Sequence, residues 1–216
     1  MKTTNAKIEL LAPAGDVKRA IIAMDYGADA IYLGGKDFSL RAHAINFTDD
    51  DIREVVQIAH SRGKKVFVTV NIIPRNDDFA QIVDYAKRLD ALQVDAVIVA
   101  DLGVIKVFRE HTKLAIHVST QANITNKHTA LEYVRLGATR LVLARELNIT
   151  EIKEICDAVK GQAEIEVFVH GAMCVSYSGR CLLSNYMTNR SSNRGDCAHS
   201  CRYKYVLQEM KRPNEY

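Results

Sequence analysis

The segment Gly27-Ala-Asp-Ala-Ile-Tyr-Leu-Gly34 contains a short apolar run enclosed between two glycines. A similar pattern, an apolar run bounded by small or turn-forming residues, occurs in Val94-Asp-Ala-Val-Ile-Val-Ala-Asp101 and in Gly137-Ala-Thr-Arg-Leu-Val-Leu-Ala-Arg145. In each copy a helical pattern ends at or near a small or turn-forming residue, and the chain then enters a buried strand. This repeated helix-to-strand unit predicts a parallel α/β fold.

Apolar runs rich in Ile, Val, Leu and Phe recur along the chain, as expected for strands that are covered on both faces. The predicted strands are Ile8–Ala12, Ala30–Leu33, Lys65–Val70, Ala96–Ala100, Ala115–Ser119, Arg140–Ala144 and Glu164–Val169. The predicted helices are Asp16–Tyr26, Asp50–Arg62, Phe79–Leu92, Leu102–Glu110, His128–Leu136 and Ile149–Lys160. Seven strands and six helices favour a TIM-barrel-like (β/α)8 fold that is incomplete. A doubly wound open sheet is the alternative, but no Gly-rich dinucleotide motif follows the first strand.

The helix expected after Thr48 begins with three acidic residues. Thr48 and Asp51 have the spacing of a capping arrangement at a helix N-terminus. We therefore interpret residues 49–51 as acids favoured by the helix dipole rather than as a metal site.

Composition excludes some classes of protein. The chain has 216 residues, 48% of them hydrophobic and 25% charged, which is ordinary for a soluble globular protein. No apolar run reaches the roughly 18 residues of a membrane span. Residues 1–7 lack the apolar core of a signal peptide, so a cytoplasmic protein with reduced thiols is expected. The net charge of +3 is too small to indicate nucleic-acid binding by itself.

Two glycines and several polar residues follow the predicted strands, where a barrel of this kind carries its chemistry. They include Gly34, Gly35, Asn71, Asp101, Thr120, Gln121, Arg145, Glu146 and His170. The candidates for binding a small polar or anionic molecule are Arg41, Asn71, Gln121 and Arg145. Arg145 suits a carboxylate held by two hydrogen bonds, or else a salt bridge that organises the rim. His170 and Glu146 are the candidate catalytic residues, although His170 could also be a ligand or a buried, hydrogen-bonded histidine.

Four of the five cysteines lie between residues 166 and 201. These are Cys174, Cys181, Cys197 and Cys201. Clustered thiolates bind zinc or iron–sulfur clusters, although the spacing differs from the paired Cys-x-x-Cys of a zinc ribbon. The alternative is a set of buried, apolar cysteines. No His-Glu-x-x-His or Gly-x-Ser-x-Gly motif occurs.

Residues 171–204 show no helix or strand period, and a long irregular segment in a compact domain is usually functional or disordered. We therefore divide the chain into a barrel portion, residues 1–171, and a Cys-rich portion of the same domain, residues 172–216.

The motif Glu166-x-Phe168-x-x-Gly171-Ala172-Met173-Cys174-x-x-x-x-Gly179-x-Cys181-x-Leu183-Ser184 resembles the signature of peptidase family U32, the collagenase-like peptidases. Leu11-Ala-Pro-Ala-Gly15, Tyr32-Leu-Gly34 and Asn193-Arg-Gly-Asp-Cys197 also resemble that family. The likeness therefore runs along the whole chain.

The resemblance implies a (β/α)8-type barrel and, in the RNA-hydroxylating branch of the family, a 4Fe-4S cluster. Cys174, Cys181 and Cys197 match the expected ligands, whereas Cys201 matches a family cysteine whose role is less defined. A further ligand is expected beyond Tyr216, so the chain resembles the N-terminal part of a longer protein. His199, Ser200 and Tyr203 depart from the family pattern.

That branch implies prephenate-dependent formation of 5-hydroxyuridine in tRNA. The partners implied are tRNA and a small anionic co-substrate such as prephenate, with no membrane. Candidate contacts to RNA phosphates are Arg180, Arg190, Arg194, Arg202 and Lys204. The alternative for these charges is a solvated loop.

Two other functions remain open, a collagenase-like peptidase and an inactive fragment with structural zinc. An open barrel edge could also pair with a second copy of the chain to form a homodimer.

Overall fold

The computed structural model describes residues 8–40, 46–206 and 210–212. Seven strands form one parallel sheet in which each strand pairs with its neighbours in the sequence, in the order β1 to β7. They are β1 (Leu11–Pro13), β2 (Ala30–Gly34), β3 (Lys65–Val70), β4 (Ala96–Val99), β5 (Ala115–Val118), β6 (Arg140–Val142) and β7 (Glu164–Glu166). The described part of the chain contains no eighth strand, so the fold is the predicted incomplete TIM-barrel-like arrangement. The predicted homodimer through the open edge stays a prediction.

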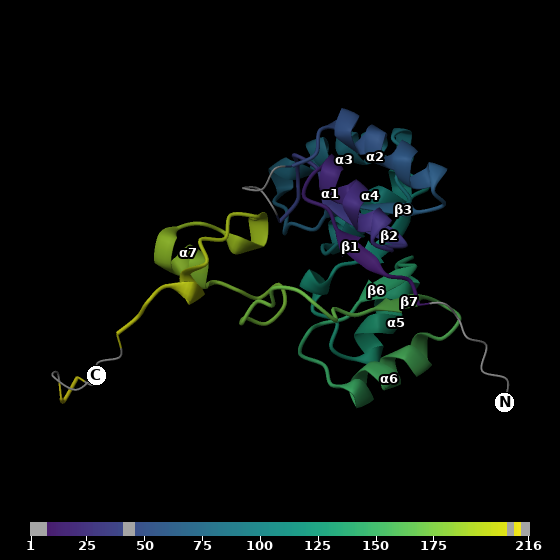
Figure 1. The fold of residues 1–216 in the computed structure, drawn as a ribbon. Helices are drawn as coiled ribbons and strands as arrows, with labels where there is room; N and C mark the ends of the chain where they lie inside the picture. Colours follow the sequence, from purple (N-terminus) through teal and green to yellow (C-terminus); the bar gives the residue numbers. More distant parts are fainter. Residues whose placement is uncertain (1–7, 41–45, 207–209, 213–216) are drawn as a thin grey trace.

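Helices connect consecutive strands and pack around the sheet (Figure 1). They are α1 (Val17–Asp25), α2 (Asp49–Ser61), α3 (Phe79–Ala91), α4 (Leu102–His111), α5 (Lys127–Arg135) and α6 (Ile149–Val159). A seventh helix, α7 (Leu183–Thr188), lies apart from them in Figure 1, at the end of a long extended segment. Within the described ranges, no helix combines the length and the apolar character that crossing a membrane requires.

The N-terminus of α2 has the predicted cap. Thr48 Oγ1 accepts a hydrogen bond from the Asp51 backbone N–H at 3.1 Å, and an Asp51 carboxylate oxygen accepts one from the Thr48 N–H at 2.8 Å. This reciprocal pair satisfies two backbone donors that the helix itself leaves unpaired. Residues 49–51 therefore act as first-turn acids, as predicted.

Side chains that point to opposite faces of the sheet form two separate apolar clusters. Ile31 and Leu33 of β2 face the helices and belong to the large core between helices and sheet. Ala30 faces the opposite way and packs with Phe67 and Ile98 in a smaller cluster inside the barrel. Successive residues of a strand point to opposite faces, so a strand buried on both sides is apolar throughout.

Two strand boundaries differ from the prediction by three residues. β1 begins at Leu11 rather than Ile8, and β7 ends at Glu166 rather than Val169. β7 pairs only with β6, and their register stops where β6 stops, with Val142 opposite Glu166. One more backbone bond follows, from the Leu143 N–H to the Glu166 carbonyl at 3.0 Å. Residues 167–169 then form no backbone hydrogen bond with the described residues, and they are exposed.

The segment expected to lack regular structure contains α7 and two short 3-10 helices, η3 (Ser192–Arg194) and η4 (Ser200–Arg202). A buried serine organises it. The Ser184 hydroxyl donates to the Arg190 carbonyl at 2.8 Å and accepts from the Ala198 N–H at 3.0 Å. These elements depend on individual side-chain contacts, which is why no sequence period indicated them. The division of the chain at residues 171 and 172 remains a prediction.

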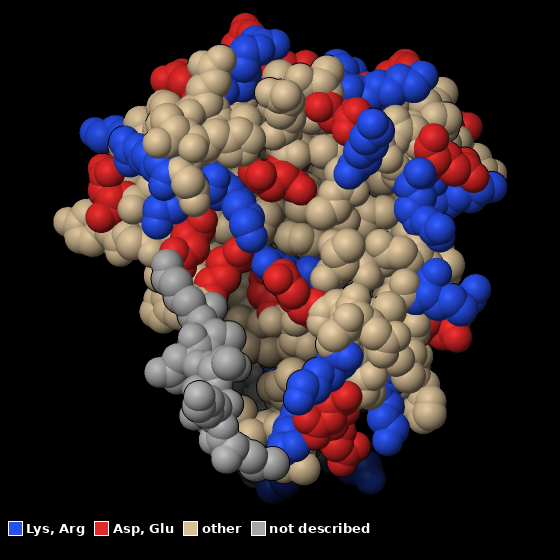
Figure 2. Space-filling view, turned by 90° about the vertical axis from the view of Figure 1, so that its right-hand side faces the viewer, with Lys and Arg blue, Asp and Glu red and all other residues tan. Residues whose placement is uncertain are grey.

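A buried arginine joins the first and last strands through the barrel interior. Arg140, at the start of β6, donates to the carboxylates of Glu9 at 2.6 Å, Glu164 at 2.5 Å and Glu166 at 3.4 Å. Its guanidinium also lies over the Phe67 ring, 5.2 Å from the ring centroid. Glu9 lies two residues before the start of β1, so the ion pairs cross the side where the sheet does not close. Figure 2 shows this end of the molecule, with acidic side chains gathered beside a central hollow.

His117 of β5 is buried beside this cluster, at the wall of a cavity of about 600 Å³. Its ring packs edge-on against Phe67 with centroids 4.6 Å apart, and its Nδ1 has no hydrogen-bond partner among the described residues. Burial, reinforced by the positive charge of Arg140, lowers the pKa of His117 to about 3. The histidine is therefore neutral in the folded protein.

Because His117 is buried in its neutral form, we expect the free energy of unfolding to depend on pH. In the unfolded chain its pKa is near the ordinary histidine value of 6.5, so acidification protonates the unfolded state first. The contribution of His117 is complete above pH 6.5 and is lost as the pH falls towards 3. We expect the free energy of unfolding to drop by about 1.4 kcal/mol per pH unit from this group between roughly pH 6 and 4.

Urea titrations at several pH values measure this dependence. His117→Gln should remove that part of the slope, whereas His128→Gln, at an exposed position in α5, should leave it intact. Equal slopes in the two variants would contradict the assignment.

Candidate functional site

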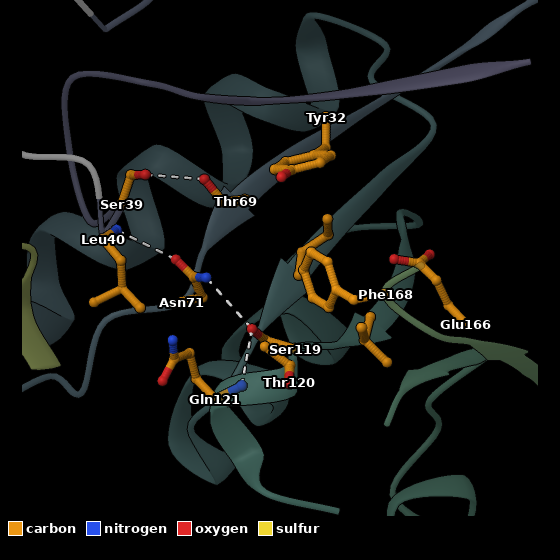
Figure 3. A pocket seen from close by; sticks show the side chains of 12 residues that line it. Tyr32, Ser39, Leu40, Thr69, Asn71, Ser119, Thr120, Gln121, Glu166 and Phe168 are labelled. Carbon is orange, nitrogen blue, oxygen red and sulfur yellow. Dashed lines mark hydrogen bonds between the residues drawn. The ribbon is translucent and has the colours of Figure 1, made fainter. Parts of the chain in front are cut away.

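A polar cavity of about 240 Å³ opens at the carboxyl ends of the strands. Its walls come from five strands and from the loops that follow β2, β3, β5 and β7 (Figure 3). The lining residues are Tyr32, Ser39, Leu40, Thr69, Asn71, Ile98, Ser119, Thr120, Gln121, Val142, Glu166 and Phe168. The cavity therefore occupies the position at which barrels of this type place their chemistry.

Asn71 and Gln121, both predicted to bind a small molecule, line this same cavity. The Asn71 Oδ1 accepts from the Leu40 N–H at 3.3 Å, and its Nδ2 donates to the Ser119 hydroxyl at 3.4 Å. Ser119 in turn accepts from the Gln121 backbone N–H at 3.3 Å. This network ties three loops together and holds the Asn71 amide in one orientation (Figure 3).

The glycines that follow β2 allow two close approaches. A Cβ atom at Gly35 would lie 2.0 Å from the Tyr85 hydroxyl oxygen, and one at Gly34 would lie 2.5 Å from the Ser39 Oγ. Such distances are well inside van der Waals contact, so the loop that carries Ser39 into the cavity requires glycine there.

Arg145 holds the cysteine segment, which we define as residues 172–206, against the rim of the barrel. Its guanidinium donates to the carbonyl oxygens of Cys174 at 2.7 Å and Ser176 at 2.9 Å, and to the Ser178 hydroxyl at 3.2 Å. The guanidinium lies 4.0 Å from Glu146. The sequence had suggested a carboxylate clamp or a rim salt bridge, and the structure adds this third set of contacts.

Glu146 supports the same segment from its other side. Its carboxylate accepts from the Ser178 N–H at 2.8 Å, and Ser178 is almost fully buried. The next residue, Gly179, packs so closely on the rim that a Cβ there would lie 2.0 Å from the Gln121 carbonyl oxygen. Residues 174–179 are thus docked beside the polar cavity. Phe168 lines both that cavity and a second one of about 320 Å³ next to Arg145 and Cys174.

The remaining predicted binding and catalytic residues are placed as follows. His170 is exposed on the segment after β7 and is absent from the described linings of both cavities. Arg41 lies outside the described residues.

All five cysteines are free thiols. Cys181 lies just before α7. Partial burial opposes its ionisation, but hydrogen bonds from the Leu183 and Ser184 N–H groups and from the Ser192 and Ser176 hydroxyls outweigh this and lower the pKa of its thiol. Such an environment favours the thiolate, the form that binds metal.

Cys197 has a related environment, since its Sγ accepts a hydrogen bond from the His199 N–H at 3.4 Å. The donors at Cys181 and Cys197 thus fit a soft metal or an iron–sulfur cluster in chemical type. Among the described residues, however, no three His, Cys, Asp or Glu side chains are grouped closely enough to hold an ion.

The predicted RNA-binding residues fall into two groups. Arg190 pairs with Asp196 at 2.6 Å, and Arg194 pairs with Asp78 at 2.7 Å, which lowers the pKa of the Asp78 carboxyl. The second pair ties the cysteine segment to the loop after β3. Arg180, Arg202 and Lys204 are exposed and form no ion pair with the described residues.

Several site residues were not among the predicted ones. Ser119 directly follows β5, so the rule that selected Thr120 and Gln121 could have found it. Glu166 and Phe168 appeared only as part of the family-like motif. Ser178 had no sequence signal, because its role depends on the approach of a distant loop to Glu146.

Comparison with known proteins agrees with this architecture. The model of peptidase family U32 matches residues 15–216. The tRNA hydroxylation protein P1 of Bacillus subtilis is 44% identical over 209 residues, covering 96% of this chain and 49% of that protein. A 23S rRNA 5-hydroxycytidine synthase of Escherichia coli is 41% identical, covering 97% of this chain and 31% of that protein.

A collagenase of Porphyromonas gingivalis is 34% identical, covering 93% of this chain and 50% of that protein. The chain thus spans half or less of the length of these relatives. Among solved structures, that of the U32 peptidase Mk0906 superposes with a TM-score of 0.65 at 18% identity, covering 77% of this chain and 70% of that one. That likeness concerns the fold. The family match over most of the chain, together with these relatives, shows that the protein belongs to peptidase family U32.

Proposed function

We propose that this chain is the barrel-bearing part of an RNA-hydroxylating protein of the cytoplasm, and that its substrate is a tRNA uridine converted to 5-hydroxyuridine. The observation that carries the proposal is that Arg145 holds the cysteine segment, through the Cys174 carbonyl, beside a polar cavity. Two relatives named for RNA hydroxylation support it. The reaction would take place at the rim, where cavity and cysteine segment meet.

The proposed cofactor is a 4Fe-4S cluster, with zinc as the alternative metal. Cys174, Cys181 and Cys197 would hold it, together with Cys201 or a ligand outside this chain. When bound, such a cluster supplies one-electron redox chemistry. The described residues contribute thiolate-stabilising hydrogen bonds at Cys181 and an anchored backbone at Cys174.

The co-substrate is proposed to be a small anion such as prephenate. The second cavity, lined by Arg145, Glu146, Cys174 and Tyr177, fits this role. The Arg145 guanidinium uses three of its five N–H donors on the cysteine segment, so two remain for a carboxylate. RNA phosphates would contact the exposed side chains of Arg180, Arg202 and Lys204. None of these three forms an ion pair with another described residue, so no such pair would have to break.

Peptidase activity is the second candidate, because a relative is named as a collagenase. A cysteine peptidase would need a base at its thiol. In the described residues, the groups that hydrogen-bond to Cys181 are backbone amides and serine hydroxyls, with no histidine among them.

Mass spectrometry of tRNA from a strain lacking the gene tests the proposal. We expect 5-hydroxyuridine to disappear, to return with the wild-type gene, and to stay below about one hundredth of the wild-type level with Cys181→Ala, because a metal site rarely tolerates the loss of a ligand. Cys156→Ala, in α6 away from the cluster, is the matched control and should restore the modification.

Unchanged 5-hydroxyuridine in the deletion strain would refute the tRNA substrate. Iron and sulfide analysis of the anaerobically purified protein separates the metals, since zinc at one equivalent without iron would contradict the cluster.

A further inference from the structure

The polar cavity at the barrel mouth has the chemistry of a site for a neutral, planar ligand. Its described lining contains side-chain amides, hydroxyls, two aromatic rings, three aliphatic side chains and the carboxyl of Glu166, with no lysine, arginine or histidine. Its volume of about 240 Å³ is below the roughly 300–1,000 Å³ of pockets for drug-sized ligands. A single heterocyclic ring fits this space, whereas a folded RNA stem does not.

Two amides in the lining have hydrogen-bonding capacity to spare. Asn71 donates one of its two amide N–H bonds to Ser119 and is oriented by the Leu40 N–H, which leaves one N–H for a ligand. The side-chain amide of Gln121 makes no hydrogen bond within the described structure. Together they offer three N–H donors and the Gln121 carbonyl oxygen, which is enough to complement the acceptor, donor and acceptor on the pairing edge of uracil.

Aromatic rings stand opposite these amides. Figure 3 shows Tyr32 and Phe168 across the cavity from Asn71 and Gln121. Phe168 is 42% exposed, so part of its ring remains available for contact. Unpaired RNA bases are commonly stacked on such rings while their edges are read by polar side chains.

We propose that this cavity receives a pyrimidine base swung out of the RNA, with Asn71 and Gln121 reading its edge and Phe168 stacking on its face. The inference rests on the proposed RNA function. It adds that the base binds in the cavity at the barrel mouth and not in the one beside Arg145. A base must leave its helix to reach such a pocket, as in other enzymes that act on nucleobases. The neighbouring cavity beside Arg145 is left for the anionic co-substrate.

A change of base preference tests the proposal. The probes are two fluorescently labelled RNA pentamers, AAUAA and AACAA, and their binding is measured by anisotropy. In Gln121→Glu the amide donor is lost, and a carboxylate accepts well from the cytosine amino group. We expect the ratio of uridine to cytidine affinity to fall by about tenfold relative to wild type.

Control variants separate this effect from misfolding. Gln57→Glu introduces the same charge on the exposed side of α2 and should leave the ratio unchanged. Phe168→Ala should weaken both pentamers by about tenfold, because stacking is insensitive to the base.

An unchanged ratio in a folded Gln121→Glu variant would overturn the pocket assignment. The assignment would also be overturned if prephenate displaced the pentamers from the wild-type protein but not from the Gln121→Glu variant, because prephenate would then occupy the cavity that contains Gln121. Either result can occur while the deletion strain still lacks 5-hydroxyuridine, so failure of the pocket and failure of the RNA function are distinguishable.

Discussion

Replacement of Arg140 by methionine should lower the free energy of unfolding by about 3–5 kcal/mol. Arg140 is 6% exposed and pairs with the half-buried carboxylates of Glu9 and Glu166 and with the exposed carboxylate of Glu164. Methionine replaces the apolar stem of the side chain but removes the guanidinium, so that Glu164 and Glu166 lose their ion pairs with it and, among the described residues, Glu9 keeps only its ion pair with Lys65. Urea titration at pH 7 measures the loss. Arg135→Met, which removes an exposed pair with Glu132, is the control and should cost less than about 1 kcal/mol.

The same variant has a pH signature. Burial opposes ionisation of Glu9, but Arg140 and Lys65 outweigh this effect and lower the pKa of Glu9 below the ordinary glutamate value of 4.5. The wild-type stabilisation from Glu9 is therefore present above pH 4.5 and is lost as the pH falls through the folded pKa. The stability gap between wild type and Arg140→Met should accordingly narrow below about pH 4.5. A gap that is constant with pH would show that packing, and not charge, explains the loss.

Substitution of Gly179 by alanine should undock the cysteine segment and reduce the proposed RNA hydroxylation by about a hundredfold, because displacing a reacting group by about 1 Å can have that effect. The added Cβ would lie 2.0 Å from the Gln121 carbonyl oxygen, and Gly179 has a φ of +69°. The contacts of Arg145 and Glu146 with residues 174–178 depend on this approach. Limited proteolysis within residues 171–182 reports undocking independently of activity.

Gly161→Ala is the control that separates the effect of backbone strain from that of a steric clash of the added Cβ atom. Gly161 has a φ of +77°, but its Cβ would meet nothing within 4 Å. This control should cost roughly 1 kcal/mol of stability and leave proteolysis of residues 171–182 unchanged. Equal proteolysis in both variants would mean that Gly179 matters only for its backbone conformation.

Much of the barrel could be predicted from local patterns. The repeated unit around residues 27–34, 94–101 and 137–145 predicted three strands, each of which forms. Thr48 and Asp51 predicted the start of α2. These features depend on residues close in the sequence, where period and capping geometry are enough. The same rule placed Asn71 and Gln121 at the mouth, because the carboxyl ends of parallel strands meet at one edge.

Other parts of the site depend on distant contacts. No period indicated α7, which is organised by buried Ser184, or the link between Arg194 and Asp78. Arg145 was visible as a rim cation, yet its contacts with Cys174 and Ser176 join residues about thirty positions apart. Hydrogen-bond partners at such separations are chosen by the packing of the whole fold.

The sequence by itself determined the class of fold, the number of visible strands and the family, because periodicity and motif spacing are local properties. Tertiary structure decided how those parts work together. It brought Glu9 to Arg140 across the unclosed side of the barrel, and it directed Arg145 to the backbone of the cysteine segment. It also set two amides against two aromatic rings in one cavity. Each of these arrangements requires the sheet to curl, which brings together side chains that no spacing in the sequence relates.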